Sequence, residues 1–483
     1  MGFAIAGGHE QTVEVAEEIL RAGGNAFDAA VGALMAAFVT EPCMASAGGG
    51  AFATLMKANG EAVVLDFFCQ TPKQTKSMQN LDLEPVMIDF GDEQETYYIG
   101  KGSNAIPGTL KGLSFINENF GRMPIKDLVQ PAIKFAKEGV ALNEFQQYDL
   151  VLLKDIFSKN EHYKSTFYNG ETVKEIGDII NMPDLADFLD YYSKDGSSAF
   201  YKGEVANKIV GDHKDKGIIT LADLSDFEVK AKKPFTFNYQ QCKIHTNNYT
   251  GAGGPIIALI LNDLEKGRPL EKSLLHLANY KNKPSLLNNA LDQIMPGHNY
   301  LYNDKPLMSR GTSHFNVLDQ WGNAISLTTS IGEGSGYFVE GTGIHINNML
   351  GELGLLPNGI NSWLPNQRLG SMMTPTILSK NGKARLVLGS GGATRIPYMI
   401  AQVIHEYATS KTLASAIDEA RMYFDGSTMH CEQEKFLAIP ANIDVHFWNK
   451  KTLFFGGVHA VSSKDGHLEA VGDARRFGAA VIG

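Results

Sequence analysis

The sequence predicts a layered α+β fold with central antiparallel sheets. The chain begins with stretches of helical periodicity, and such stretches recur later. Two hairpin patterns lie between them, and the last residues alternate like strands. Helices and hairpins that alternate in blocks fit helices layered on antiparallel sheets.

Residues 11–38 are expected to form two helices. Apolar residues recur at helical spacing from Val13 to Leu20, and Gly23-Gly24-Asn25 then interrupts the pattern. An alanine-rich second helix is expected from Ala29 to Phe38, opened or capped by Asp28. Its small side chains allow close packing, so we expect this helix to be buried.

A hairpin and further helices are expected next. Residues 51–56 and 61–67 alternate like strands around the turn Asn59-Gly60, which predicts a hairpin. Residues 106–141 open on a Pro-Gly turn and continue as helices. Residues 145–232 alternate charged and apolar positions at helical spacing and are expected to be peripheral helices.

After Pro234 short strands are expected, interrupted by one helix. Residues 315–329 have a hairpin pattern, and Leu386–Leu388 reads as a strand that runs into a glycine turn. Residues 397–410 follow a helical pattern, and residues 458–481 return to strands. No internal repeat or low-complexity linker interrupts the 483 residues.

Composition indicates a soluble globular protein. A hydrophobic content of 43% and a charged content of 20% are ordinary values for that class. The net charge of -10, without a basic run, argues against nucleic acid as a partner. No stretch approaches the roughly 18 to 20 apolar residues of a membrane span. The N-terminus lacks a signal-peptide pattern, so we expect a cytoplasmic protein or one whose leader has been removed.

No metal site or cofactor is expected. The cysteines show no metal-ligand spacing and are expected to be free thiols. They are scattered along the chain: Cys43, Cys69, Cys242 and Cys431. The runs Gly251–Gly254 and Gly389–Gly392 superficially resemble phosphate loops, but neither is followed by Lys or lies in an evident βαβ unit. If these turns have a function, we expect their backbone N–H groups to bind an oxyanion.

Thr312 becomes a candidate nucleophile through the motifs around it. Alone, Gly311-Thr312-Ser313-His314 is only a turn entering a strand. The chain also carries an ordered series of short motifs: Gly23–Val31, Glu41-Pro42, Gly48–Phe52, Ile106–Thr109, Leu128–Ala132, Gly322–Ala324, Asn347-Asn348, Met373–Thr376 and Gly389–Gly392. In this order the series resembles the gamma-glutamyltranspeptidases from end to end. The resemblance implies the four-layer αββα sandwich of the N-terminal-nucleophile hydrolases.

The resemblance also implies that the chain cuts itself between Gly311 and Thr312. The products would be a large subunit, residues 1–311, and a small subunit, residues 312–483, that stay associated as one αββα domain. Thr312 would attack the preceding carbonyl and, once freed, would use its own α-amine as base. Such an amine has a pKa of about 7.7 to 8.0, so part of it is unprotonated near neutrality. An acyl-Thr312 intermediate would pass to water or to an amine.

Three further positions match the family's catalytic groups. Ser330 takes the place of a second hydroxyl residue that steadies the nucleophile's amine. Gly392 and Ala393 match the two backbone N–H donors of the oxyanion hole. Since these donors are backbone groups, Ala393 retains the function while adopting a conformation that glycine accepts more easily.

The substrate-binding positions depart from the family pattern. Phe68 stands where an Arg grips the substrate α-carboxylate, and Ser371 and Met372 match two serines that also touch it. Gly332 replaces an Asn, and Glu352 matches the acid that holds the substrate amino group. Loss of the Arg removes a charge-assisted contact worth about 1.5–3 kcal/mol. We therefore expect hydrolysis of amides with a less anionic, more apolar acyl group rather than efficient glutathione turnover.

Several alternatives stay open at this point. Another basic residue, such as Arg310, Arg368 or Arg395, could replace the missing Arg. The protein could be an amidase or acylase acting on a substrate that is not γ-glutamyl, or a non-catalytic scaffold. The expected partners are a small amide or peptide substrate and the two subunits themselves, with a homo-oligomer left open.

Overall fold

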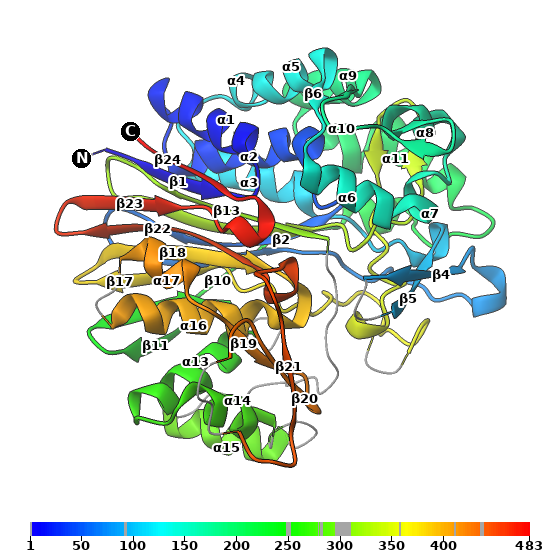
Figure 1. The fold of residues 1–483 in the computed structure, drawn as a ribbon. Coiled ribbons are helices and arrows are strands. Elements are labelled where there is room, and N and C mark those ends of the chain that lie inside the picture. Colours follow the sequence, from blue (N-terminus) through cyan, green and yellow to red (C-terminus); the bar gives the residue numbers. More distant parts are fainter. Residues whose placement is uncertain are drawn as a thin grey trace.

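The computed structural model describes residues 2–90, 94–247, 253–278, 280, 284–294, 311–356, 359–409, 412–434 and 439–483. These residues form four layers, in which two sheets are stacked face to face and helices cover both outer faces (Figure 1). The predicted α+β sandwich of αββα type is confirmed.

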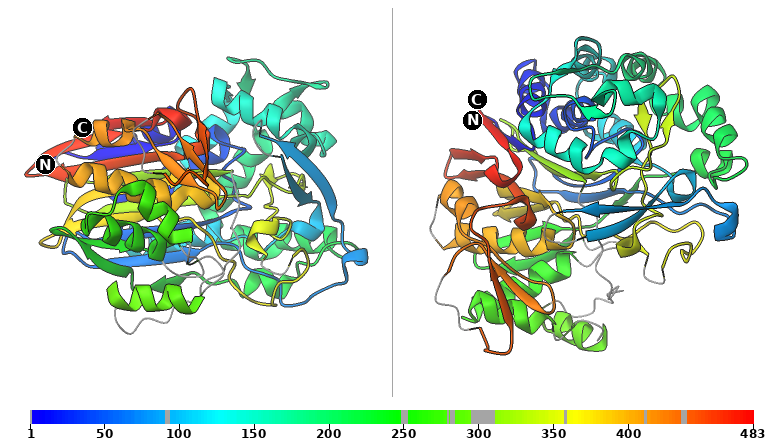
Figure 2. Two further views of the ribbon diagram at one scale, coloured as in Figure 1. Left: turned by 60° about the horizontal axis from the view of Figure 1, so that its bottom comes forward. Right: turned by 45° about the vertical axis from the view of Figure 1, so that its right-hand side comes forward.

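The first sheet has seven antiparallel strands in the order β10-β3-β2-β14-β13-β1-β24 within the described chain. Their bounds are β1 Ala4–Gly7, β2 Gly50–Met56, β3 Ala62–Phe67, β10 Lys230–Lys232, β13 Thr312–Leu318, β14 Ala324–Ser330 and β24 Ala479–Ile482. Strand β1, from before Gly311, lies between β13 and β24, which follow it, so the two predicted subunits share one sheet. The ends of the chain pair through β1 and β24 and lie side by side (Figure 2).

The second sheet is also antiparallel and has the order β11-β12-β17-β18-β22-β23. Its strands are β11 Phe235–Tyr239, β12 Cys242–Thr246, β17 Thr376–Lys380, β18 Lys383–Gly391, β22 Gly457–Lys464 and β23 His467–Val471. Strand β18 lies against β13 and β14 of the first sheet. His314 fills the space above Gly389, where an added Cβ would come within 2.2 Å of the imidazole. This close contact brings the C-terminal end of β18 next to the start of β13.

Helices from the first half of the chain cover the first sheet. Those that pack on its strands are α1 Glu10–Arg21, α2 Ala26–Thr40 and α3 Thr109–Phe120. Farther out, packed on α2 and on one another, lie α4 Ile125–Leu128, α5 Gln130–Glu138 and α9 Pro183–Asp195. Every residue of α2 is buried, as expected for the alanine-rich helix. A capping box between Asn25 and Asp28 starts α2 three residues earlier than the predicted Ala29.

Residues 145–232, where peripheral helices are expected, are largely helical. This region contains α6 Glu144–Leu152, α7 Lys154–Phe157, α8 Glu161–Phe167, α10 Ser198–Tyr201, α11 Gly203–Asp212 and α12 Leu221–Ser225. Short two-stranded pieces lie among these helices: β6 Val140–Ala141, β7 Tyr168–Asn169, β8 Thr172–Val173 and β9 Ile179–Ile180. The hairpin of β4 Glu84–Asp89 and β5 Gln94–Ile99, which the sequence reading did not predict, extends away from the sheets (Figure 2).

The expectation of short strands directly after Pro234 is wrong for residues 253–294. This part contains α13 Gly253–Glu265, α14 Leu270–Ala278 and α15 Pro284–Ile294. Residues 256–261 are uniformly apolar and buried, and such a run gives no period that distinguishes a strand from a buried helix. With α16 Ile396–Ala408 and α17 Leu413–Asp418, α13 covers the second sheet (Figure 1).

Two small sheets complete the described part of the fold. They are formed by β15 Phe338–Val339 with β16 Ile344–His345, and by β19 Met422–Phe424, β20 Thr428–Cys431 and β21 Asp444–Phe447. Short 3-10 turns also occur, and η4 Ala393–Arg395 matters most because it follows the glycine turn after β18.

Candidate active site

Thr312 is the first residue of the central strand β13 and is almost fully buried. In the antiparallel register it faces Ser330, the last residue of β14, and Ser330 in turn faces Gly50 of β2. A Cβ on the neighbouring Gly49 would lie 2.6 Å from the Ser330 carbonyl oxygen. The glycine run before β2 thus lets this strand approach closely and places the two hydroxyl residues side by side.

The carbonyl of the predicted cleavage bond is already hydrogen-bonded. Ser330 Oγ donates to the Gly311 carbonyl oxygen over 2.7 Å and accepts from Gly332 N–H over 3.0 Å. Because the backbone N–H occupies one lone pair of the hydroxyl, the Ser330 proton faces the carbonyl. This arrangement polarises the carbonyl that Thr312 is predicted to attack.

Gly311 fits a position where no side chain is tolerated. An added Cβ would lie 2.0 Å from the Gly332 carbonyl oxygen and 3.0 Å from that of Cys43. Both contacts are with backbone atoms, which cannot easily move aside. The space around the predicted cleavage bond therefore requires a glycine before the predicted nucleophile.

Two charged residues that the sequence did not point to contact the backbone on either side of the predicted cleavage bond. Glu333 Oε1 accepts the Gly311 N–H over 3.2 Å, and Arg476 Nη1 donates to the Thr312 carbonyl oxygen over 3.0 Å. Both side chains are buried. In the sequence, Glu333 is only a charged residue in a glycine-rich turn, and Arg476 is only an arginine near a C-terminal strand. Neither pattern predicts a contact with residues 311 and 312.

The predicted oxyanion donors lie at the end of β18. Gly392 has a φ of 117° and Ala393 a φ of 56°, so both adopt left-handed backbone conformations that bend the chain sharply. Ala393 lines the same cavity as Thr312. A Cβ on Gly391 would lie 2.6 Å from the Thr312 carbonyl oxygen, which shows how closely this turn approaches the nucleophile. Ala393 thus accepts the conformation that the sequence reading required of it.

A narrow cavity opens beside Thr312 and joins several predicted site residues. Its room is about 10 Å³, roughly that of one water molecule. Its lining is mostly apolar: Phe68, Thr312, Ser330, Leu355, Ser371, Met372, Met373, Ala393 and Ile396. The structure thus brings together Phe68, Ser371 and Met372 with the nucleophile. The Phe68 ring is stacked on Phe52, with ring centroids 5.4 Å apart.

Glu352 and Gly332 lie together but are not among the residues that line this cavity. A Cβ on Gly332 would come within 2.0 Å of Glu352 Oε1, so the carboxyl group occupies the place of a side chain at position 332. Glu352 is 1% exposed, and neither carboxyl oxygen has a hydrogen-bond partner among the described residues. Burial, followed by the nearby Glu333 and Glu95, raises the Glu352 pKa well above its ordinary 4.5. The two departures from the family pattern are therefore sterically coupled.

Two of the three basic residues considered as replacements for the missing Arg are engaged elsewhere. Arg368 forms an ion pair with Asp66 over 3.2 Å and donates to the Phe68 carbonyl oxygen over 2.7 Å. Arg395 lies over the Phe454 ring, 4.4 Å from its centroid. Arg310 lies outside the described residues. Among the described residues that line the Thr312 cavity, none carries a positive charge.

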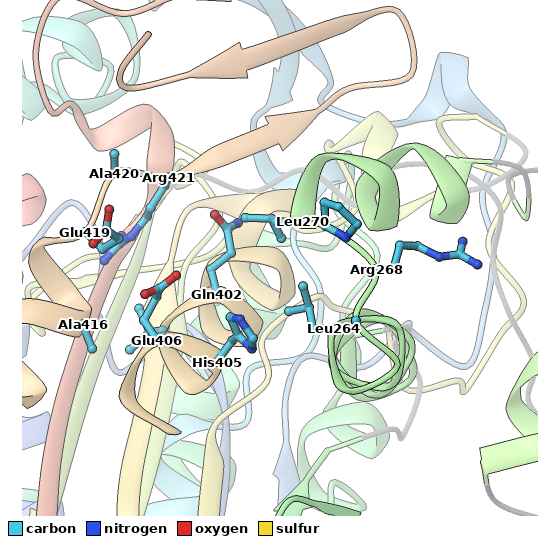
Figure 3. A pocket seen from close by; sticks show the side chains of 13 residues that line it. Leu264, Arg268, Leu270, Gln402, His405, Glu406, Ala416, Glu419, Ala420 and Arg421 are labelled. Carbon is cyan, nitrogen blue, oxygen red and sulfur yellow. The ribbon is translucent and has the colours of Figure 1, made fainter. Parts of the chain in front are cut away.

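A larger cavity, of about 270 Å³, lies where the turn between α13 and α14 meets α16 and α17 (Figure 3). Figure 3 shows Arg268 extending away from Gln402, His405 and Glu406 rather than toward them. Arg421 in its wall is held by Asp473 over 2.6 Å. None of the predicted catalytic residues lines this cavity, so size alone does not identify the active site.

Other kinds of site find no support in the described chain. Within the residues that the structure describes, no group of three or more His, Cys, Asp or Glu side chains is placed to hold a metal ion. The four cysteines are free thiols. Across the described residues, every helix is too short or too polar to cross a membrane. The cytoplasmic location stays a prediction.

Comparison with known proteins decides the family. The sequence profile described as Gamma-glutamyltranspeptidase matches residues 12–283 and 270–483. The chain belongs to the gamma-glutamyltranspeptidase family. It is therefore an enzyme of the N-terminal-nucleophile type that is made as a self-processing precursor.

Relatives and solved structures agree with this assignment. The glutathione hydrolase proenzyme of Bacillus subtilis is 29% identical, with 99% of this chain and 91% of the relative covered. The capsule biosynthesis protein CapD proenzyme of Bacillus anthracis is 26% identical, with coverages of 99% and 90%.

Among solved structures, cephalosporin acylase from Bacillus halodurans has a TM-score of 0.82 at 21% identity, over 99% of this chain and 95% of that chain. At that identity the likeness shows the shared fold. Gamma-glutamyltranspeptidase from Helicobacter pylori has a TM-score of 0.51 at 29% identity, over 60% of this chain and 91% of that chain.

Proposed function

We propose that the chain cuts itself between Gly311 and Thr312, giving subunits of residues 1–311 and 312–483. The Thr312 hydroxyl adds to the Gly311 carbonyl carbon, the C–N bond breaks, and the hydroxyl proton ends on the departing nitrogen. Water then hydrolyses the ester and leaves a free amine and hydroxyl on Thr312. The hydrogen bond from Ser330 to the Gly311 oxygen supports this step, because it stabilises the charge that develops there.

In the mature enzyme, Thr312 attacks the carbonyl carbon of an amide substrate. Its α-amine takes the hydroxyl proton and returns it to the leaving amine. The N–H groups of Gly392 and Ala393 face the negative oxygen of the tetrahedral intermediate. The resulting acyl-Thr312 ester is then passed to water or to an amine acceptor.

The acyl group that fits is less anionic and more apolar than γ-glutamyl. The observation that carries this proposal is the lining of the Thr312 cavity, which contains Phe68 and Met372 and no cation among its described residues. An α-carboxylate placed there would lose hydration without gaining a charged partner. Glu352 is buried without a hydrogen-bond partner among the described residues but does not line this cavity, so its match to the acid that holds a substrate amino group stays a prediction.

Two alternatives to this proposal are an enzyme that prefers γ-glutamyl amides and a non-catalytic scaffold. Several relatives are named glutathione hydrolases, so γ-glutamyl amides are the natural reference substrates. A non-catalytic scaffold would leave a single band near 52.6 kDa on a denaturing gel. The family match shows an enzyme, and the intact Gly311-Thr312 pair with its hydrogen bonds agrees with it.

The test is a comparison of kcat/KM for γ-glutamyl anilide and for anilides of uncharged acyl groups of increasing size. We expect the apolar acyl anilides to be hydrolysed faster. A large preference for the γ-glutamyl compound would refute the substrate proposal while leaving the reaction type intact. The Thr312→Ala protein serves as the background for every rate.

A further inference from the structure

The four-residue segment 330–333 encloses Gly311 on three sides. Ser330 Oγ donates to its carbonyl oxygen over 2.7 Å, and the Gly332 carbonyl oxygen faces its Cα at a distance that no Cβ would tolerate. Glu333 Oε1 accepts its N–H over 3.2 Å. These contacts limit the rotation of residue 311 about both of its backbone bonds.

Glu333 itself is held firmly. Its side chain is 2% exposed, and its own N–H donates to Asn348 Oδ1 over 2.9 Å. Glu333 lines a small cavity together with Gly311, Asp149 and Arg476. The cavity at Thr312 has no lining residue in common with it, and Glu333 is not among its lining residues. Glu333 thus contacts the residue before the cut and not the acyl pocket.

We propose that Glu333 is a positioning residue for self-cleavage. By holding the Gly311 N–H, it keeps the Gly311 carbonyl turned toward Ser330 and presents the carbonyl carbon to the Thr312 hydroxyl. The bond changes are those of the self-cleavage step above, and Glu333 neither gains nor loses a proton in them. Since Gly311 becomes the end of the large subunit, this contact serves the precursor and not the turnover of substrate. The inference rests on the proposed self-cleavage.

The experiment follows precursor cleavage in the full-length chain. Wild type, Glu333→Ala, Glu333→Gln and Glu333→Asp are pulse-labelled, and first-order cleavage rates are measured on denaturing gels. Asp149→Asn is the matched control, because Asp149 lines the same cavity and makes no hydrogen bond to Gly311 in the structure. The kcat and KM of the cleaved fraction and the unfolding temperature of each protein are measured in parallel.

We expect Glu333→Ala to slow cleavage about ten- to a hundredfold, because the variant loses one hydrogen bond to a charged group. Glu333→Gln keeps a side-chain oxygen at the same reach and should restore most of the rate. Glu333→Asp keeps the charge but not the reach, so it should stay slow. Asp149→Asn should cleave at nearly the wild-type rate. The kcat and KM of the cleaved enzyme should change little in any variant.

Three results would overturn the proposal: wild-type cleavage by Glu333→Ala, equal slowing by Gln and Ala, or a parallel fall in the kcat of the cleaved fraction. Should the Ala protein fail to fold, the contrast between Gln and Asp still decides. A wild-type chain that never cleaves would instead reject the proposed function itself, so the two failures are distinguishable.

Discussion

Ser330 Oγ lies 2.7 Å from the carbonyl oxygen of Gly311 and donates a hydrogen bond to it. In the proposed self-cleavage, this hydroxyl therefore acts on the carbonyl that Thr312 attacks. After cleavage that carbonyl belongs to a new chain end, and the same hydroxyl is left beside the freed Thr312 amine. One side chain can thus serve both the processing step and the mature reaction, because the antiparallel register holds it opposite Thr312.

The double role of Ser330 predicts two linked defects. Ser330→Ala removes one donor to the developing oxyanion and should slow self-cleavage about a hundredfold or more. Turnover per cleaved site should also fall, since the amine loses its neighbour. Ser330→Thr keeps the hydroxyl and should retain both activities. Pulse-chase gels and kinetics of the cleaved fraction measure the two effects, and an Ala variant with normal processing would contradict the assignment.

Replacing the nucleophile should abolish both reactions. Thr312→Ala has no hydroxyl to attack either carbonyl, so it should remain a single 52.6 kDa band. Wild type should give two bands of about 34 and about 19 kDa, in proportion to the lengths of the subunits and the 52.6 kDa total. Thr312→Ser keeps a hydroxyl and should cleave, more slowly. Cleavage or turnover in the Ala protein would show that the nucleophile is misassigned.

Ala393 should tolerate glycine better than a larger residue. Its φ of 56° is strained for any side chain, and glycine adopts it at no steric cost. Ala393→Gly should therefore keep the oxyanion donor, retain activity and unfold at the same or a higher temperature. Ala393→Val adds a β-branched side chain to the same conformation and should lower both kcat and stability. Equal loss in the two variants would argue against a role of the backbone turn.

Phe68→Arg should shift substrate preference toward γ-glutamyl compounds. A guanidinium in the cavity would offer the α-carboxylate a charge-assisted pair, worth roughly ten- to a hundredfold in relative kcat/KM. The change should also lower the unfolding temperature, because it breaks the stack on Phe52 and buries a charge. Phe68→Leu is the control that alters shape without charge. Ratios of kcat/KM for γ-glutamyl and uncharged acyl anilides give the readout.

Glu352 should make the protein less stable as the pH rises. Its folded-state pKa lies well above the ordinary 4.5, chiefly through burial. Above pH 4.5 the unfolded chain has lost this proton while the folded chain keeps it. The free energy of unfolding therefore falls with rising pH until the folded-state pKa is reached, by at most about 1.4 kcal/mol per pH unit.

Glu352→Gln removes this titration, so the free energy of unfolding should depend less on pH above pH 4.5. Denaturant unfolding at several pH values measures it, with Glu271→Gln as a second buried acid for comparison. A slope unchanged by Glu352→Gln would show that the carboxyl group is charged in the folded protein.

The sequence by itself determined the features whose signals are local. The Gly311-Thr312 pair, the glycine turn before Ala393 and the helix that follows Asn25 depend on conformations set within a few residues. Together with the ordered motifs they indicated the fold class, the nucleophile and the second hydroxyl at Ser330. Helix α13 escaped prediction because its unbroken apolar run carries no periodicity. Helices α14 and α15 mix polar and apolar residues, so this reason does not apply to them.

Only the tertiary structure decided which distant side chains meet at the cleavage bond. Arg476 reaches the Thr312 carbonyl from 164 positions away, and Glu352 fills the space that Gly332 leaves open. The ion pair of Arg368 with Asp66 leaves this arginine unable to replace the missing cation. Such contacts depend on strand order and register, which join residues by their place in two stacked sheets rather than by their spacing along the chain.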